Sequence, residues 1–212
     1  MLMKHEWRKH ERALYLPKGV QELDVPTMTY LTLRGQGDPN TPTFSAQIQA
    51  LYPVAYAIRM ALKRGEVGDP YEYTVYPLEG VWTTTDGSRD ATLNKAALAY
   101  TIMLRQPDQV TPGLFHWAVD QTRGKHPSPY LEQLQLTTYT AGPAVQATHV
   151  GSFDTEGETF AQMRAYLTAH GLTTVPTMGA YQHREIYLSD FRRVAPEKRK
   201  TTLRWRVRKE VL

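Results

Sequence analysis

Alternation of apolar and polar residues predicts seven β-strands along the chain. Segments rich in β-branched and aromatic residues with a period of two are typical of strands that bury one face. The predicted strands cover residues 28–34, 71–82, 96–105, 131–139, 145–150, 183–188 and 203–208. The run 141–143, Ala-Gly-Pro, is expected to separate the fourth strand from the fifth.

Helical spacing of apolar residues predicts three helices. The first covers 41–64, with Thr41 as cap, and Pro53 is expected to kink it or split it in two. A shorter helix follows at 111–124, again after a Thr-Pro start. The third begins near residue 154 or 155 and ends before Gly171.

The two halves of the chain carry their elements in the same order. Each has a strand that ends near a glycine, then a helix and two strands, which indicates a duplicated βαββ unit, although chance could produce part of this similarity. We therefore expect an α+β fold with one antiparallel-rich sheet, helices on one face and an open groove between the repeats. The expected boundaries lie within a single domain, 1–212: repeat 1 at 24–108, a linking helix at 111–124 and repeat 2 at 130–209.

Composition excludes several classes of protein. The 212 residues are 41% hydrophobic and 22% charged, which argues against disorder, and the absence of cysteine excludes disulfides and thiol catalysis. No signal-peptide pattern is present, and the longest largely apolar run, 96–104, is too short to cross a bilayer. We expect a cytoplasmic protein without a membrane partner.

Positive charge is concentrated near the C-terminus. Nine basic residues stand against one acidic residue between Arg192 and Lys209, although the whole chain carries only +4. The segment could attract nucleic acid, but alternation of Arg204, Arg206 and Arg208 with apolar residues favours a solvated strand face. No helix-turn-helix pattern accompanies it, so we expect no nucleic-acid partner.

Glu185 is the main candidate for chemistry. In the strand 183–188, alternation places His183, Glu185 and Tyr187 on the face opposite Ile186. A carboxylate that points into an aromatic groove is expected to have a raised pKa and could serve as a general base or pair with a cation. Alternatively, Glu185 is a structural partner of an arginine of the last strand.

Aromatic residues could form the wall of a ligand pocket. Trp82 follows the strand that contains Tyr76 and Glu79, and Tyr52 and Tyr56 lie on the first helix. A flat ring offers a surface for stacking, although large aromatic residues more often pack in a core. We interpret these side chains as candidate ligand contacts.

Other kinds of site are less well supported. His183, Glu185 and His149 could supply metal ligands, but no recognised spacing is present and we expect no metal. No Gly-x-Ser-x-Gly elbow and no phosphate-binding loop occurs in the sequence. A serine hydrolase and a P-loop nucleotidase are therefore excluded.

Six motifs in order resemble the stand-alone members of the GyrI-like small-molecule-binding family. They are Leu-Arg-Gly-Gln-Gly-Asp-Pro-Asn at 33–40, Ala-Leu-Tyr at 50–52, Pro-Leu-Glu-Gly-Val-Trp at 77–82, Arg-Gln-Pro-Asp at 105–108, Val-Gln-Ala-Thr-His-Val-Gly at 145–151 and Glu-Ile-Tyr-Leu-Ser-Asp-Phe-Arg-Arg at 185–193. The resemblance implies a duplicated SHS2-type fold with a ligand groove between the repeats. Relatives bind bulky aromatic or cationic drugs, and some hydrolyse the cyclopropane of DNA-alkylating cyclopropanoids. Glu185 matches the acidic groove residue of the family and Trp82 its aromatic wall.

The resemblance implies a function in which Glu185 activates water against a cyclopropane ring, with Tyr187 or Tyr76 as donor to the carbonyl oxygen. His149, His183 and Glu79 are further expected ligand contacts, and no cofactor is required. Two alternatives are a non-catalytic binder of bulky aromatic or amphipathic drugs and a gyrase-interacting protein. Thr83, Arg184 and Phe191 depart from the family pattern and bear on the substrate range.

Overall fold

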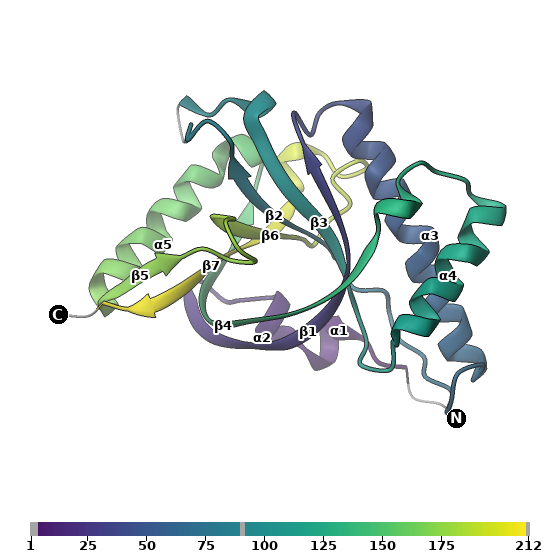
Figure 1. Cartoon of the computed structure of the whole chain (residues 1–212). Coiled ribbons are helices and arrows are strands. Elements are labelled where there is room, and N and C mark those ends of the chain that lie inside the picture. The colour runs from purple at the N-terminus through teal and green to yellow at the C-terminus, as the bar shows by residue number, and fades with distance from the viewer. Residues whose placement is uncertain (1–3, 90–91, 211–212) are drawn as a thin grey trace.

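The fold combines an antiparallel sheet that closes on itself with helices packed outside it (Figure 1). The computed structural model describes residues 4–89 and 92–210. The strands are β1 Gln21–Gln36, β2 Leu78–Thr84, β3 Leu98–Gln106, β4 Gln135–Val150, β5 Leu172–Val175, β6 His183–Tyr187 and β7 Lys200–Lys209. The α-helices are α1 Trp7–His10, α2 Arg12–Tyr15, α3 Pro42–Arg64, α4 Pro112–Lys125 and α5 Glu156–His170, and the 3₁₀ turns include η2 Lys95–Ala97, η3 Leu131–Gln133, η4 Phe153–Thr155 and η5 Pro196–Lys198.

Strand order divides the sheet into two similar sets. The order is β4-β1-β3-β2-β6-β7-β5, and β4 also pairs with β7, which closes a ring of six strands. The first half contributes β1-β3-β2 and the second contributes β4-β7-β6, so the two sets follow the same pattern. They meet at two seams, β1–β4 and β2–β6, and all of these pairings are antiparallel.

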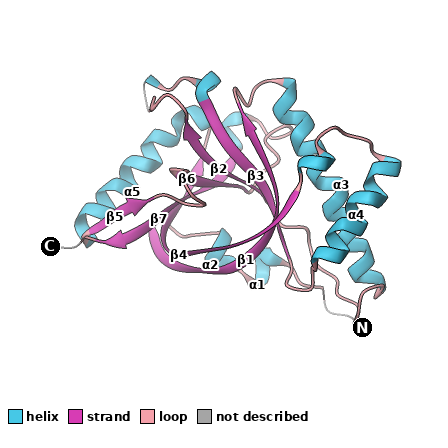
Figure 2. Ribbon diagram, viewed as in Figure 1, coloured by secondary structure: helices cyan, strands magenta, loops and turns pink. Residues whose placement is uncertain are grey.

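The long helices cover separate parts of the ring (Figure 2). Helix α3 packs on β1 and β3 and is flanked by α4, whereas α5 packs on β4 and β5. On α3, Ile48, Leu51 and Ile58 recur at helical spacing and are buried in the main core. On α5, Met163 and Leu167 are buried in a smaller core together with Leu203 of β7 and neighbouring strand residues. The helical periodicity in the sequence therefore corresponds to the buried faces.

A shared bend in β1 and β4 replaces the predicted break at 141–143. Val25 and Met28 of β1 are three residues apart yet pack in one cluster, as do Ala141 and Ala144 of β4. The alternation of inward and outward side chains therefore shifts by one position in both strands. Gly142 has a φ of 68°, which glycine adopts without steric cost. The strand bends there and continues, so the expected separation of two strands is wrong.

The segment 71–77 is not a strand of the sheet, contrary to expectation. It packs against the N-terminal segment, where the His5 N–H donates to Glu72 O and the Trp7 indole donates to Val75 O. Tyr73 and Tyr76 are buried in the core although they are three positions apart, and Tyr71 packs against the same core. Similarly, Pro53 lies inside an unbroken α3, so the expected split is not observed.

Two basic strand residues are buried rather than solvated. Arg204 is 4% exposed, and its guanidinium donates to Gln146 Oε1 and to the carbonyl of Leu14. Burial and the nearby Arg184 lower the pKa of Arg204. Arg184 donates to Tyr30 and pairs with a glutamate within the ring. The expected solvated strand face is therefore wrong at Arg204.

No helix among residues 4–89 and 92–210 is long and apolar enough to cross a bilayer.

Candidate functional site

Glu185 lies at the β2–β6 seam, on the side of the sheet that also carries Trp82. In the register of the two strands, Glu185 is opposite Gly80 and His183 is opposite Trp82. Directly opposed residues share a face, so these side chains gather on one side of the seam. Arg184, which alternates with them, points into the ring instead and bonds to Tyr30. Alternation correctly places Glu185 opposite Ile186. The expectation that this face is free of helices is wrong, because Phe160 of α5 contacts His183 on it.

A chain of hydrogen bonds holds the Glu185 carboxylate. The Tyr187 hydroxyl donates to Glu185 Oε2 at 2.7 Å, and His183 Nε2 donates to Oε1 at 2.9 Å. Trp82 Nε1 donates in turn to the Tyr187 oxygen at 3.1 Å. The Glu185 side chain is 12% exposed and that of His183 is 21% exposed, so neither side chain is fully buried. Tyr187 and His183 thus orient the carboxylate of Glu185.

The alternative role of Glu185 as an arginine partner is not observed. Arg204 bonds to Gln146, and Arg206 donates to the carbonyl of Ala141. Arg204 pairs with Arg184 in the β6–β7 register and therefore faces into the ring. The carboxylate of Glu185 therefore accepts hydrogen bonds from His183 and Tyr187.

Gly80 provides the space beside the carboxylate. A Cβ at this position would lie 2.6 Å from Trp82 Nε1 and 3.3 Å from the Tyr187 hydroxyl. The 2.6 Å contact is shorter than real Cβ atoms make, so any larger residue would displace the indole. The glycine therefore lets Trp82 reach Tyr187.

Aromatic side chains surround the hydrogen-bonded group. The ring centroid of Phe153 lies 5.9 Å from that of Tyr187, and Phe191 lies 5.4 Å from Tyr187. Phe160 of α5 contacts His183 with centroids 5.2 Å apart. Trp82 itself is 5% exposed. The expected aromatic wall is present, but packed side chains cover it where an open groove was expected.

Glu156, which the sequence analysis missed, is a second carboxyl group at this site. It is 7% exposed, and its Oε1 has no hydrogen-bond partner. Burial raises its pKa well above 4.5, and the charges of Glu185 and Asp154 add to the shift. Its position in the first turn of α5 gave no signal, because acidic residues are ordinary there.

Tyr187 remains a proton donor under all ordinary conditions. Its hydroxyl is buried, and burial raises its pKa well above 10.0, with the Glu185 carboxylate as the next cause. The phenol therefore keeps its proton and directs it to Glu185.

Two predicted ligand contacts lie elsewhere. Tyr76 lines a separate cavity of about 280 Å³ together with Tyr71 and Arg105, and its hydroxyl donates to Glu11. Glu79 is buried inside the ring and pairs with Arg184 at 3.3 Å. Tyr76 and Glu79 are close to Trp82 in sequence. Glu79, three positions before Trp82 in β2, nevertheless points to the opposite face of the strand.

Tyr52, Tyr56 and His149 do not bond to Glu185. Tyr52 and Tyr56 lie on α3 with centroids 6.5 Å apart, and Tyr56 is 51% exposed. His149 Nδ1 bonds to Thr159 at 2.9 Å, so this imidazole supports the start of α5. Across residues 4–89 and 92–210, no group of three His, Asp or Glu side chains could hold a metal ion.

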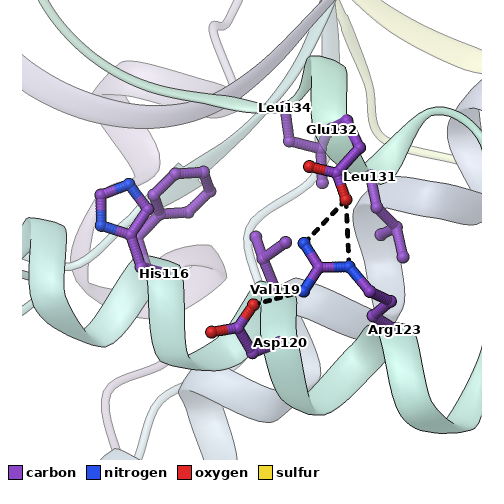
Figure 3. Close-up of a pocket in the computed structure, with 8 residues that line it drawn as sticks. His116, Val119, Asp120, Arg123, Leu131, Glu132 and Leu134 are labelled. Atoms are coloured by element: carbon purple, nitrogen blue, oxygen red, sulfur yellow. Dashed lines mark hydrogen bonds and ion pairs between the residues drawn. The ribbon is translucent and has the colours of Figure 1, made fainter.

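A larger cavity lies on the other side of the molecule, along α4 (Figure 3). It measures about 380 Å³, and Leu131 and Leu134 line it together with residues of α4. Arg123 lies at its rim and bonds to both Asp120 and Glu132 (Figure 3). None of the residues predicted from the sequence as ligand contacts lines this cavity.

Comparisons with solved structures show close relatives. A hydrolase from Listeria innocua is 34% identical, with a TM-score of 0.85, over 96% of this chain and 100% of that one. An uncharacterized conserved protein from Listeria innocua is 36% identical, with a TM-score of 0.87, over 96% of this chain and 100% of that one. Comparison with curated protein sequences gave no match.

A more distant structure shares the fold alone. The EcmrR C-terminal domain is 13% identical, with a TM-score of 0.51, over 93% of this chain and 99% of that one. A family model, the GyrI-like small molecule binding domain, matches residues 19–208. That match spans the ring, α3, α4 and α5, and includes the Glu185 site. The chain therefore belongs to the GyrI-like family of small-molecule-binding domains.

Proposed function

We propose that the Glu185 site binds a bulky aromatic or amphipathic small molecule and hydrolyses the cyclopropane ring of cyclopropanoid DNA-alkylating compounds. The observation that carries this proposal is one carboxylate, oriented by Tyr187 and His183, at a seam lined by aromatic rings. The 34% identity to a hydrolase from Listeria innocua supports the catalytic part. We also infer that the two βαββ sets are repeats of one SHS2-type unit, which places the site between repeats.

The proposed reaction needs only water and the side chains of the site. Glu185 accepts a proton from water as the water oxygen bonds to the ring CH₂. The strained carbon–carbon bond breaks, its electron pair moves through the dienone to the carbonyl oxygen, and that oxygen takes up a proton to give a phenol. Trp82 is placed to stack against the flat ligand once the covering side chains move aside.

We assign the donor to the carbonyl oxygen to Tyr187. The sequence left Tyr187 and Tyr76 as candidates, but Tyr76 lies in a separate cavity. The Tyr187 proton is directed at Glu185 in the free protein, and the hydroxyl can turn to the ligand as negative charge develops there.

Turnover of a duocarmycin, followed by mass spectrometry of the ring-opened product, tests the proposal. Glu185→Gln removes the base with little change in shape and is expected to lower kcat by at least about 100-fold. Glu158→Gln, on an exposed position of α5, is the matched control and is expected to retain full activity. Undiminished turnover by Glu185→Gln would exclude Glu185 as the base.

A second candidate function is sequestration without chemistry. The observation that favours it is the group of aromatic rings around Tyr187, which can contact a planar ligand whether or not Glu185 acts as a base. Binding of the duocarmycin by the parent protein with no ring-opened product would support this function over hydrolysis.

A further inference from the structure

The inside of the strand ring contains more positive than negative charge. Arg184 of β6 and Arg204 of β7 are directly opposed in the register of these strands, so both side chains lie on the inner face. They are 2% and 4% exposed, and Glu79 of β2, which pairs with Arg184, is 1% exposed. Arg206, the next residue on this face of β7, is half-buried and donates to two backbone carbonyls. Two fully buried guanidinium groups therefore share one carboxylate, and an unbalanced buried charge destabilises the folded protein.

The groups around Arg204 in the described part of the chain do not balance its charge. Arg204 donates to Gln146 Oε1 at 3.0 Å and to a backbone carbonyl, which are neutral acceptors. Burial raises the pKa of Tyr30 above 10.0, so its hydroxyl stays neutral at ordinary pH. Arg105 of β3 is paired with Glu11, and this ion pair adds no net charge.

Arg184 has a donor group that could bind a ligand. Its Nη1 donates to the Tyr30 hydroxyl at 3.0 Å and to Glu79 Oε2 at 3.3 Å. Its Nη2 is buried and has no hydrogen-bond partner among the described residues. A buried donor without an acceptor costs free energy. An anion would supply both the acceptor and the missing negative charge, whereas a water molecule would supply the acceptor alone.

The surroundings of Arg184 favour a small anion. Its guanidinium carbon lies 5.3 Å from the ring centroid of Tyr30 and 5.9 Å from that of Tyr139. Val81 and Met103 are fully buried in the same inner cluster. Neither of the two cavities described above has Arg184 among its lining residues. The space beside Nη2 therefore suits an ion of one atom better than a phosphate or an organic acid.

We propose that the interior of the ring binds one chloride-sized monovalent anion, held by Arg184 Nη2 and by the positive charge of Arg204. This site is separate from the Glu185 site, because Arg184 alternates to the opposite face of β6. The bound anion stabilises the pairing of β6 with β7, since these strands place two like charges directly opposite each other.

Urea unfolding at increasing chloride concentration tests for this anion. Sodium isethionate replaces sodium chloride at constant ionic strength, which keeps the screening of surface charges fixed, and the isethionate anion is too large for the interior. Chloride bound only to the folded protein is expected to lower the unfolding equilibrium constant about tenfold for each tenfold rise in chloride above its Kd. An unchanged constant between chloride-free buffer and about 500 mM chloride would overturn the proposal.

Two variants that change the charge inside the ring have opposite expected effects. Arg184→Met leaves one arginine beside one glutamate and is expected to lose the dependence on chloride. Glu79→Gln leaves two arginines without an acid and is expected to lower the Kd of chloride by about tenfold. Arg208→Met removes an exposed positive charge from the end of β7 and is the matched control, expected to keep the dependence of the parent. Full retention of the dependence by Arg184→Met would contradict the assignment.

Bromide locates the ion in the parent protein, so this measurement does not depend on the folding of a variant. Crystals grown in sodium bromide are expected to show an anomalous peak within hydrogen-bond distance of Arg184 Nη2. A water molecule at Nη2, with bromide confined to the protein surface, would identify the bound halide as an adventitious ion only and would overturn the proposal.

Discussion

A residue without a side chain shapes the environment of Glu185. Gly80 stands opposite Glu185, and the Trp82 indole occupies the volume that a Cβ would need. The indole then donates to Tyr187, which donates to Glu185. Orientation of the carboxylate thus depends on the smallest residue of β2.

We expect Gly80→Ala to weaken binding of a planar aromatic ligand and to cost about 1–3 kcal/mol of unfolding free energy, because the new Cβ displaces the indole. Gly124→Ala on α4 is the control: a Cβ there meets nothing within 4 Å, and the change is expected to stabilise slightly because alanine favours a helix. Urea unfolding and ligand titration measure both effects. Equal stability and affinity in the two variants would show that the indole adapts freely.

At this scale the sequence predicted which residues share a face with Glu185, but it wrongly placed the helices on the opposite face. Alternation within one strand is a local property, so the face shared by His183, Glu185 and Tyr187 could be predicted. The position of Glu156 depends on how α5 packs on the sheet, and local sequence patterns carry no information about that packing. Tyr76 was misplaced for the same reason, because its partner Glu11 is distant in sequence.

Among the elements, α5 carries half of the site. The turn before it contributes Phe153, its first turn contributes Glu156 and its second contributes Phe160. The helix ends at Gly171, whose φ of 60° is left-handed and whose N–H bonds to Leu167 and Thr168 carbonyls. The position of Glu156 therefore depends on a helix held at both ends.

Gly171→Ala is expected to destabilise the protein by about 1–2 kcal/mol, because a Cβ is disfavoured in the left-handed region. Nothing lies within 4 Å of the added Cβ, so the cost arises from the backbone alone. Gly157→Ala, inside the same helix and also free of contacts, is expected to stabilise by about 0.5–1 kcal/mol. Thermal unfolding distinguishes the two, and a shift of the same sign in both would contradict this account.

The helices were predicted well, because each buries one face at helical spacing and has a recognisable start or end. The segment 71–77 was predicted as a strand because its aromatic residues alternate. The same pattern occurs here in a segment outside the sheet that packs against the N-terminal segment. The short β5 lies in a run with little alternation, and only its pairing with β7 makes it a strand.

On the scale of the whole molecule, closure of the sheet was not foreseen. An antiparallel-rich sheet could be predicted from the order of elements, but the β4–β7 pairing joins residues that are distant in sequence, from Val150↔Lys200 to Ala144↔Arg206. Closure places Arg184, Arg204 and Glu79 in the interior, where charged groups are costly unless they are paired. That interior explains why Arg204 is buried, whereas Arg208 and Lys209 at the end of β7 are exposed.

The stability of the protein is expected to depend on pH through Glu156. The folded protein keeps this proton to a higher pH than the unfolded chain, because burial and Glu185 raise the pKa above 4.5. The folded state therefore binds more protons as pH rises above 4.5, and unfolding free energy falls over that range.

Glu156→Gln removes the titrating group, so the unfolding free energy of the variant should fall less as pH rises. Relative to the parent, the unfolding free energy of the variant is therefore expected to be higher at about pH 8 than at about pH 5. Urea unfolding at both pH values measures the difference. Glu158→Gln, an exposed change on the same helix, should leave the pH dependence intact, and an identical curve for Glu156→Gln and the parent would contradict the argument.

The seam between β2 and β6 gives the site a mechanical consequence. One half of the chain provides Trp82 and the other provides Glu185, while only four residue pairs join the two strands there. A ligand held between these side chains fastens the two halves at their shorter junction. Occupancy should therefore raise the force needed to pull β2 away from β6, and leave the longer β1–β4 junction unchanged.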